Sequence, residues 1–498
     1  MNQNKTIRIM NGRPVIFQNG APVSQAAYFD RIMRGDWEDR VREFVESGVK
    51  VFHLTSPHGG ADFFDSGLWT DDGVYRDEDP AKFAYPLTKQ AEYILSLQPQ
   101  AKFYIGLGTS VPIAWSKRYP GEMQTDENGR TYREASVSSE RYLKDLARFL
   151  RHLVRSCEAK PWGDRIVGYM VAPYGEGVLP LTIAGKMFDC SKANETAFRQ
   201  WVKEHYRTEA RLRKAWGDPK IGFARVRVPR DAEWLAKKRA IAPTLNGEPL
   251  TTGSLPANGL AQHDGLFHWI EPRQAAREHD YCRFMREVWT RWVHTIVHAI
   301  KKEAAALGRS RLTAIDVGKQ PLMGWEILSS FDGIGDGASF PNMLFLSGSW
   351  KVADLLDDKD LDAFITPADY TARTLGYAYE AEGLTDSMVL RGKTMVVEND
   401  ARCYVGAGVH DQGAFRNETE VEAGLLRNAA LTLSRGFQSY WCNVGSSYFH
   451  DAGIHKTVAR IVPMLDRLNT APHRETTDAI GVIIDDESLF YEDFTSGY

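Results

Sequence analysis

The sequence predicts a (β/α)8 barrel, an α/β fold. Strand-like apolar runs alternate with helix-length amphipathic segments along most of the 498 residues, and eight such runs can be counted. An open, doubly wound sheet is the alternative, but such a sheet should carry a glycine-rich phosphate loop after an early strand. The chain has neither a GxGxxG nor a GxxxxGKS/T motif, which favours the barrel.

The expected elements follow one another along the chain. Two short apolar runs around Asn19-Gly20 predict a hairpin over residues 13–23. The segment 140–157 is predicted to be a helix because its large apolar side chains share one face, and Gly48 is expected to end the first helix. Strands are expected at 26–29, 49–55, 102–107, 165–172, 312–317, 361–366, 394–397 and 438–442, and the main helices at 37–47, 86–97, 140–157 and 279–307.

The barrel is predicted to occupy residues 1–475. A mixed insert is expected at about 177–275, after the fourth strand, where the regular alternation breaks down. The apolar run at 479–484 resembles another buried strand, of the kind that begins a doubly covered sheet. We therefore expect residues 476–498 to begin a second α/β domain.

Composition and charge exclude several classes of protein. Hydrophobic residues make up 43% and charged residues 25%, as in a globular enzyme, and the net charge of −4 argues against a nucleic-acid partner. No stretch approaches 18 apolar residues, so no membrane partner is expected, and the N-terminus lacks the apolar core of a signal peptide, which predicts a cytoplasmic protein. The five widely spaced cysteines are expected to be free thiols, and neither a metal nor a cofactor is predicted.

Two glutamates follow predicted strands at the end of the barrel where chemistry is expected. Glu176 comes after the fourth strand and Glu398 after the seventh, each just beyond a buried apolar run. One carboxyl can protonate the leaving oxygen of a glycoside while the other, ionised, attacks the anomeric carbon. Asp400 and Arg402 lie close enough in sequence to hold Glu398 charged. The alternative is that each glutamate is a solvated loop residue or part of a structural ion pair.

Several motifs resemble those of a known enzyme family. Residues 198–206 (FRQWVKEHY) and 212–217 (LRKAWG) are similar to a segment that follows the fourth strand in glycoside hydrolase family 42, the β-galactosidase family. Residues 392–402 resemble the strand-seven motif of relatives in the same clan, with its Glu-Asn-Asp-x-Arg core, and the run at 480–489 resembles the start of the domain that follows the barrel.

This resemblance carries several implications. It implies that Glu176 is the acid/base and Glu398 the nucleophile, and that residues 476–498 begin a Rossmann-like trimerisation domain, so a homo-oligomer, a trimer, is expected. The family places Asn before the strand-four glutamate, where it binds the sugar 2-hydroxyl, but this chain has Gly175. That difference puts the identity of the sugar in question. Only Cys190 lies where family members cluster zinc-binding cysteines, so no such zinc site is expected.

Other residues near strand ends are predicted to bind the sugar. Aromatic rings suit the apolar faces of sugars, and polar groups suit their hydroxyls. For each residue the alternative is a core or surface position without substrate contact. Tyr370 is also expected to hydrogen-bond the nucleophile. The predicted substrate-binding set is Asp30, Arg31, His53, His58, Trp115, Tyr174, Tyr370, Asp400, Arg402, Trp441 and Asn443.

The sequence therefore predicts a retaining exo-β-glycosidase, most similar to a β-galactosidase, that acts on an oligo- or polysaccharide. A β-mannosidase, a β-fucosidase, and an endo-acting or inverting barrel hydrolase are the alternatives within enzymes. A barrel that binds carbohydrate without cleaving it is the alternative outside them.

Overall fold

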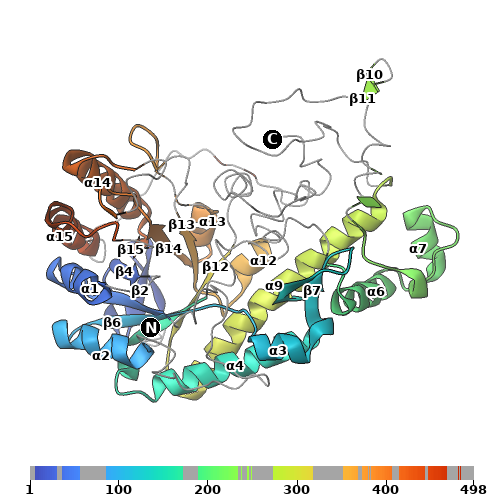
Figure 1. Cartoon of the computed structure of the whole chain (residues 1–498), viewed down its shortest axis with the longest axis horizontal. Coiled ribbons are helices and arrows are strands. Elements are labelled where there is room, and N and C mark those ends of the chain that lie inside the picture. The colour runs from blue at the N-terminus through green and yellow to red at the C-terminus, as the bar shows by residue number, and fades with distance from the viewer. Residues whose placement is uncertain are drawn as a thin grey trace.

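The chain folds around a closed barrel of eight parallel strands (Figure 1). The computed structural model describes residues 6–30, 36–55, 86–171, 189–230, 273–317, 352–367, 373–379, 383–406, 414–443 and 447–467, with shorter pieces within 232–249 and at 381, 481 and 483. In spatial order the barrel strands are β12 (Leu312–Asp316), β13 (Ala363–Pro367), β14 (Thr394–Asn399), β15 (Gln438–Asn443), β4 (Ala26–Asp30), β5 (Val51–Thr55), β6 (Lys102–Leu107) and β9 (Ile166–Val171).

Helices surround this barrel, as the predicted alternation of strands and helices requires. The larger ones are α1 (Trp37–Glu46), α2 (Leu87–Leu97), α4 (Glu140–Glu158), α9 (Ala276–Ala306), α14 (Glu418–Arg435) and α15 (Ala452–Asp466). Shorter helices are α3 (Ile113–Arg118), α6 (Lys192–Tyr206), α7 (Glu209–Trp216), α12 (Val352–Asp357) and α13 (Thr385–Leu390), with 3-10 turns at Pro120–Glu122, Gly163–Arg165 and Phe223–Arg225.

Small antiparallel sheets lie outside the barrel. β1 (Ile7–Met10), β2 (Arg13–Gln18) and β3 (Ala21–Pro22) form the expected hairpin region, while β7 (Met123–Thr125) pairs with β8 (Thr131–Ala135) and β10 (Thr244–Leu245) with β11 (Glu248–Pro249). Asn19 and Gly20, at φ +48° and +83°, make the turn between β2 and β3.

The eight predicted strands and the (β/α)8 class are confirmed, with strand boundaries within two residues of expectation. The insert contains more regular structure than the sequence indicated, because residues 192–216 form α6 and α7. Ser191 and Thr208 cap these helices by accepting hydrogen bonds from the amides of Asn194 and Arg211. The predicted second domain lies almost entirely outside the described residues.

The motif at 198–217 folds against the N-terminal half of α9 (Figure 1). Asp280 of α9 accepts hydrogen bonds from the Tyr206 hydroxyl at 2.6 Å and from the Trp216 indole N–H at 2.7 Å. The Trp201 indole donates to Glu287, about two turns further along α9, at 2.9 Å. The tryptophans and the tyrosine of this motif therefore attach the insert to the barrel's longest helix.

Two apolar layers determine which way each strand residue points. Val51, Ala314 and Val396 belong to a small cluster inside the barrel, whereas Met395 and Val397 belong to the larger cluster between barrel and helices. Successive side chains of a strand alternate between these two layers. Residues of even number in β12, β14 and β15 face the interior, as do residues of odd number in β4 and β5.

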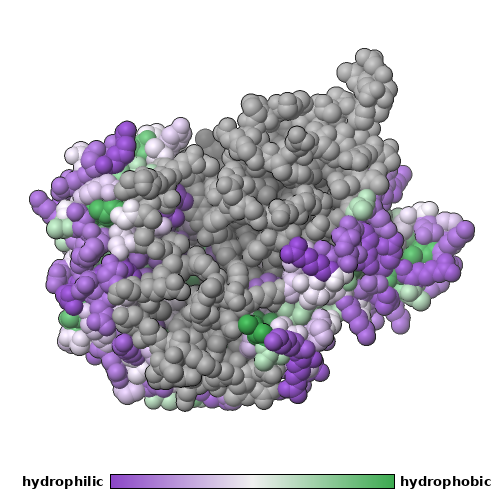
Figure 2. Space-filling view, in the orientation of Figure 1, coloured by the Kyte–Doolittle hydropathy of each residue, from purple (hydrophilic) through white to green (hydrophobic). Residues whose placement is uncertain are grey.

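The described surface is mainly hydrophilic on the face shown in Figure 2. The exposed large hydrophobic residues among the described ones are scattered along the chain, which is ordinary for a globular protein. None of the described helices is both long and apolar enough to cross a membrane.

Candidate active site

The site is built on neighbouring strands β14 and β15, at the C-terminal end of the barrel. Glu398 and Tyr440 are paired across these strands, and both follow the inward-facing alternation. The Tyr440 hydroxyl donates a hydrogen bond of 2.6 Å to Oε2 of Glu398. Tyr440 is only 3% exposed, while Glu398 is partly accessible. The strand register thus brings a buried donor to a partly accessible carboxylate.

Electrostatics keep Tyr440 in its donor form. Burial raises the pKa of Tyr440 well above its ordinary value, and the negative charges of Glu398 and Asp316 raise it further. A tyrosine in this setting keeps its proton at neutral pH. Its hydrogen bond to Glu398 favours the ionised form of that carboxyl, as hydrogen bonds to a charged acceptor do.

His53 lies beside this pair, as an inward-facing residue of β5. Its ring centroid is 4.6 Å from that of Tyr440 and 5.3 Å from those of Phe29 and Tyr104. Burial lowers the pKa of His53 to about 3, so the imidazole is neutral. Its Nε2 is buried and has no hydrogen-bond partner among the described residues.

Asp316 is a site residue that sequence reasoning missed. It ends β12 on the inward side, is 9% exposed, and is close enough for its charge to act on Tyr440. Tyr440 was missed in the same way. Every second residue of a strand faces the barrel interior, and this alternation could have been followed to the end of each strand. Leu312 and Ala314 face inward, so Asp316, two residues further, should face inward as well.

Asp400 and Arg402 form an ion-pair cluster just beyond the end of β14. Nη1 of Arg402 is 3.1 Å, and Nη1 of Arg373 3.4 Å, from Oδ2 of Asp400. The Arg402 guanidinium also lies over the Tyr448 ring, 4.5 Å from its centroid. These contacts hold the residues just after Glu398 in place, so Asp400 and Arg402 stabilise the end of β14.

Four of the residues predicted to contact sugar have side chains that face the packed layer between barrel and helices, or lie within it. Asp30 pairs with Nε of Arg40 on α1 at 2.8 Å and accepts hydrogen bonds from Tyr28 and, at 3.3 Å, Asn443. Burial raises the pKa of Asp30, although Arg40 opposes this shift. Asp30 and Asn443 thus fasten β4 and β15 to α1.

The two predicted tryptophan contacts are buried in helix packing. Trp441 faces outward from β15, with its ring centroid 5.8 Å from Phe44 of α1. Trp115 lies on α3 with 0% exposure, and its indole N–H donates to Asp145 of α4 at 3.0 Å. For Trp441 and Asn443 the physical reason is strand parity, which places odd-numbered residues of β15 outside the barrel.

The other predicted site residues lie outside the described part of the chain. They are Glu176, Tyr174, Arg31, His58 and Tyr370. Glu176 follows β9 by five residues, and β9 forms part of the same closed barrel as β14. The assignment of Glu176 therefore remains a prediction from sequence.

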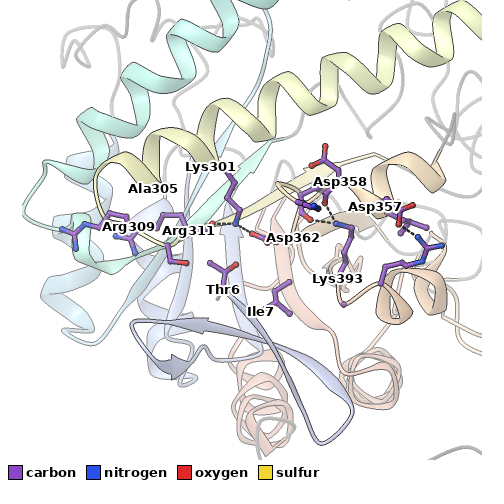
Figure 3. A pocket seen from close by; sticks show the side chains of 16 residues that line it. Thr6, Ile7, Lys301, Ala305, Arg309, Arg311, Asp357, Asp358, Asp362 and Lys393 are labelled. Atoms are coloured by element: carbon purple, nitrogen blue, oxygen red, sulfur yellow. Dashed lines mark hydrogen bonds and ion pairs between the residues drawn. The ribbon is translucent and has the colours of Figure 1, made fainter. Parts of the chain in front are cut away.

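A separate polar cavity of about 640 Å³ opens at the N-terminal ends of β12, β13 and β14, opposite the strand ends that carry Glu398 (Figure 3). Its cations are already engaged. Lys301 pairs with Asp362, and Nζ of Lys393 donates to the carbonyls of Asp358 and Leu361, both at 2.6 Å. We assign this cavity no role in the chemistry, since barrel enzymes act at the other end.

Comparison of the sequence with models of known protein families and with curated proteins found no match. Solved structures do match. A β-galactosidase from the psychrophilic Marinomonas ef1 is 13% identical with a TM-score of 0.50, and the match covers 89% of this chain and 60% of that one. A β-galactosidase from the Antarctic haloarchaeon Halorubrum lacusprofundi is 15% identical with a TM-score of 0.53, covering 90% and 59%.

The catalytic domain of a β-amylase from Paenibacillus polymyxa is also similar, with 14% identity, a TM-score of 0.52, and coverage of 88% of this chain and 97% of that one. The chain spans about 60% of the length of the two β-galactosidases. At these identities the likeness concerns the fold, and the chain is a (β/α)8 barrel of the type that these β-galactosidases and this β-amylase share.

Proposed function

We propose that the protein is a retaining β-glycoside hydrolase with Glu398 as its nucleophile. The observation that carries the proposal is the inward-facing carboxylate of Glu398 at the C-terminal end of β14, held by the Tyr440 hydroxyl at 2.6 Å. A partly accessible carboxylate at this end of a barrel, with a buried donor that favours its charge, is suited to attack an anomeric carbon.

The reaction proceeds by two displacements. An oxygen of Glu398 forms a bond to the anomeric carbon while the glycosidic C–O bond breaks, and Glu176 gives its proton to the departing oxygen. Glu176 then takes a proton from water, whose oxygen attacks the anomeric carbon and releases Glu398. Neutral His53 and the carboxylate of Asp316 lie near Tyr440 in the barrel interior, which supports a role for both beside the reacting carbon.

The family resemblance and the fold together support a relative of glycoside hydrolase family 42. We propose exo action on a terminal β-galactoside first, and a β-mannoside or β-fucoside next, because Gly175 replaces the residue that contacts the 2-hydroxyl in that family. A homo-oligomer, trimeric by the same resemblance, belongs to this proposal.

A panel of nitrophenyl β-galactoside, β-mannoside and β-fucoside tests the activity. The wild-type protein should hydrolyse at least one of them, and Glu398→Gln should lower kcat by at least about 10³-fold because the amide cannot act as the nucleophile. Glu422→Gln, at a partly exposed position on α14, is the matched control and should behave like wild type. Near-normal turnover by Glu398→Gln would refute the assignment, and sugar binding without hydrolysis would favour a non-catalytic barrel.

A further inference from the structure

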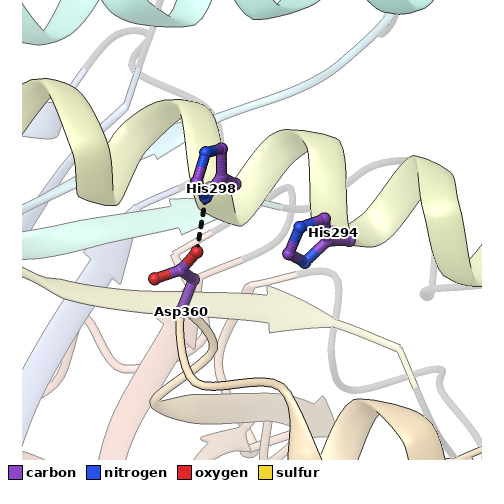
Figure 4. A group of neighbouring side chains, drawn as sticks. All are labelled: His294, His298 and Asp360. Carbon is purple, nitrogen blue, oxygen red and sulfur yellow. Dashed lines mark hydrogen bonds and ion pairs between the residues drawn. The ribbon is translucent and has the colours of Figure 1, made fainter.

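We propose that His294, His298 and Asp360 form a binding site for a divalent transition metal, of which Zn²⁺ is the best match. The two histidines lie on α9, and Asp360 lies in the turn between α12 and β13 (Figure 4). No metal was expected from the sequence, because the chain has no cysteine or mixed cysteine–histidine ligand spacing.

The helix places both imidazoles on one face. Residues four apart on a helix are neighbours, and a His-x-x-x-His pair on one face is a known arrangement for binding zinc. The two rings are stacked, with centroids 5.3 Å apart. One ligand atom from each of the two histidines and from Asp360 lies within 4.8 Å of the others.

These distances are close to those of an occupied site. Zinc–ligand bonds of about 2.0–2.1 Å in a tetrahedron separate two ligand atoms by about 3.3 Å. The histidine side chains are 53% and 49% exposed, so rotation about their own torsions can close the remaining gap. Their exposure also leaves room for water as a fourth ligand.

The carboxylates are held in place before any ion arrives. Oδ2 of Asp360 is 2.6 Å from Nδ1 of His298, and Oδ2 of Asp358 is 2.8 Å from Nδ1 of His294. The other carboxylate oxygen of Asp358 accepts the amide of Asp360 at 2.8 Å, and the Asp358 carbonyl accepts Nζ of Lys393. Asp358 therefore either orients His294 from outside or becomes a fourth ligand.

Charge and ligand type select the ion. Two imidazole nitrogens and the Asp360 carboxylate supply the donors, and the nearby Asp358 carboxylate adds further negative charge to offset a divalent cation. Imidazole nitrogen favours Zn²⁺, Ni²⁺ or Cu²⁺ over Mg²⁺ and Ca²⁺, which prefer oxygen ligands. The site is on the outer surface, near the start of β13, so the ion would link α9 to this turn and stabilise the fold without taking part in catalysis.

Zinc titration of metal-stripped, tag-free protein tests the proposal. Isothermal titration calorimetry should give one equivalent bound with a dissociation constant in the micromolar range or below, and the melting temperature should rise by a few degrees. His298→Ala and Asp360→Asn should each lose this equivalent and the thermal shift. His152→Ala, on α4, is the matched control and should keep both.

Absence of zinc binding by the wild-type protein would overturn the proposal. So would full retention of the bound equivalent in both His298→Ala and Asp360→Asn, because the zinc would then be held elsewhere. Both variants should fold, since the altered side chains lie at the surface. Hydrolysis of the nitrophenyl glycosides should not change on zinc removal, which separates this proposal from the proposed function.

Discussion

At the level of single residues, the hydrogen bond between the Tyr440 hydroxyl and the Glu398 carboxylate is the contact on which the proposed function depends. A tyrosine that stays protonated because it is buried can donate to a carboxylate that must be ionised to serve as the proposed nucleophile. The Tyr379 hydroxyl makes a second contact with this residue, by donating a hydrogen bond of 3.3 Å to the backbone carbonyl oxygen of Glu398. Both the charge and the position of Glu398 therefore depend on neighbouring side chains.

Tyr440→Phe should lower kcat/KM by about 10- to 100-fold, because a hydrogen bond to a charged group is worth about 1.5–3 kcal/mol. Loss of the donor disfavours the ionised form of the Glu398 carboxyl, so the acid limb of the profile of kcat/KM against pH should move to higher pH. Tyr377→Phe, at a position 64% exposed, should leave both unchanged. An unshifted acid limb in Tyr440→Phe would show that the hydroxyl does not act on Glu398.

The low pKa of His53 predicts that the folded protein loses stability in acid. Burial depresses its pKa from 6.5 to about 3 in the folded protein, so between these pH values the unfolded chain binds a proton that the folded chain does not. The free energy of unfolding should therefore decrease as the pH falls from 6.5 toward 3, by up to about 1.4 kcal/mol per pH unit.

Urea unfolding at pH 7, 6 and 5 checks this prediction. His53→Gln cannot take up the proton, so its free energy of unfolding should fall less steeply with decreasing pH than that of the wild type. His152→Gln, at a partly exposed position on α4, is the control and should keep the wild-type slope. Equal slopes in His53→Gln and wild type would mean that His53 titrates normally.

The candidate site was only partly predictable from sequence. Glu398 and His53 were predicted to lie at strand ends, and the structure places both side chains in the barrel interior. Trp441 and Asn443 were predicted from their nearness to a strand end, but a single step along a strand reverses the direction of the side chain. Counting parity from the buried core positions would have selected Tyr440 and Asp316 instead.

At the scale of elements, the barrel strands could be predicted because a strand covered on both sides is a nearly continuous apolar run. β6, for example, has the predicted bounds of Lys102–Leu107. α6 and α7 were harder to predict, because their apolar stripes are short and their stability depends on hydrogen bonds to Asp280. Such tertiary partners are not visible in local sequence.

A buried ion pair between Glu158 and Arg311 links the end of α4 to the start of β12. Nε and Nη2 of Arg311 each lie 2.8 Å from an oxygen of Glu158, and both side chains are nearly inaccessible to solvent. The pair is bidentate, so the guanidinium satisfies both carboxylate oxygens.

Arg311→Met should destabilise the fold by about 3–5 kcal/mol in urea unfolding, because the buried Glu158 loses its bidentate partner and keeps, among the described residues, only Tyr169 at 3.1 Å and Arg309 at 3.6 Å. The double variant Glu158→Met/Arg311→Met should recover much of this loss. Arg291→Met breaks the exposed pair with Glu140 and should cost less than about 1 kcal/mol. A loss in Arg311→Met no greater than in Arg291→Met would contradict the assigned role.

For the whole molecule, the near balance of 61 basic and 65 acidic residues predicts weak steering of substrate by charge. The value of kcat/KM for a neutral nitrophenyl glycoside should change less than about twofold between 0.05 and 0.5 M salt. A steep decrease with salt would contradict this prediction.

The central claim is that Glu398 attacks the anomeric carbon. A 2-deoxy-2-fluoro glycoside with a good leaving group slows both displacements but keeps the first possible, so the glycosyl–enzyme intermediate accumulates. Peptide mass spectrometry of the inactivated protein should then find the fluorosugar on Glu398. Labelling of a different carboxylate, or an absence of covalent label in a protein that still hydrolyses the parent glycoside, would contradict the account.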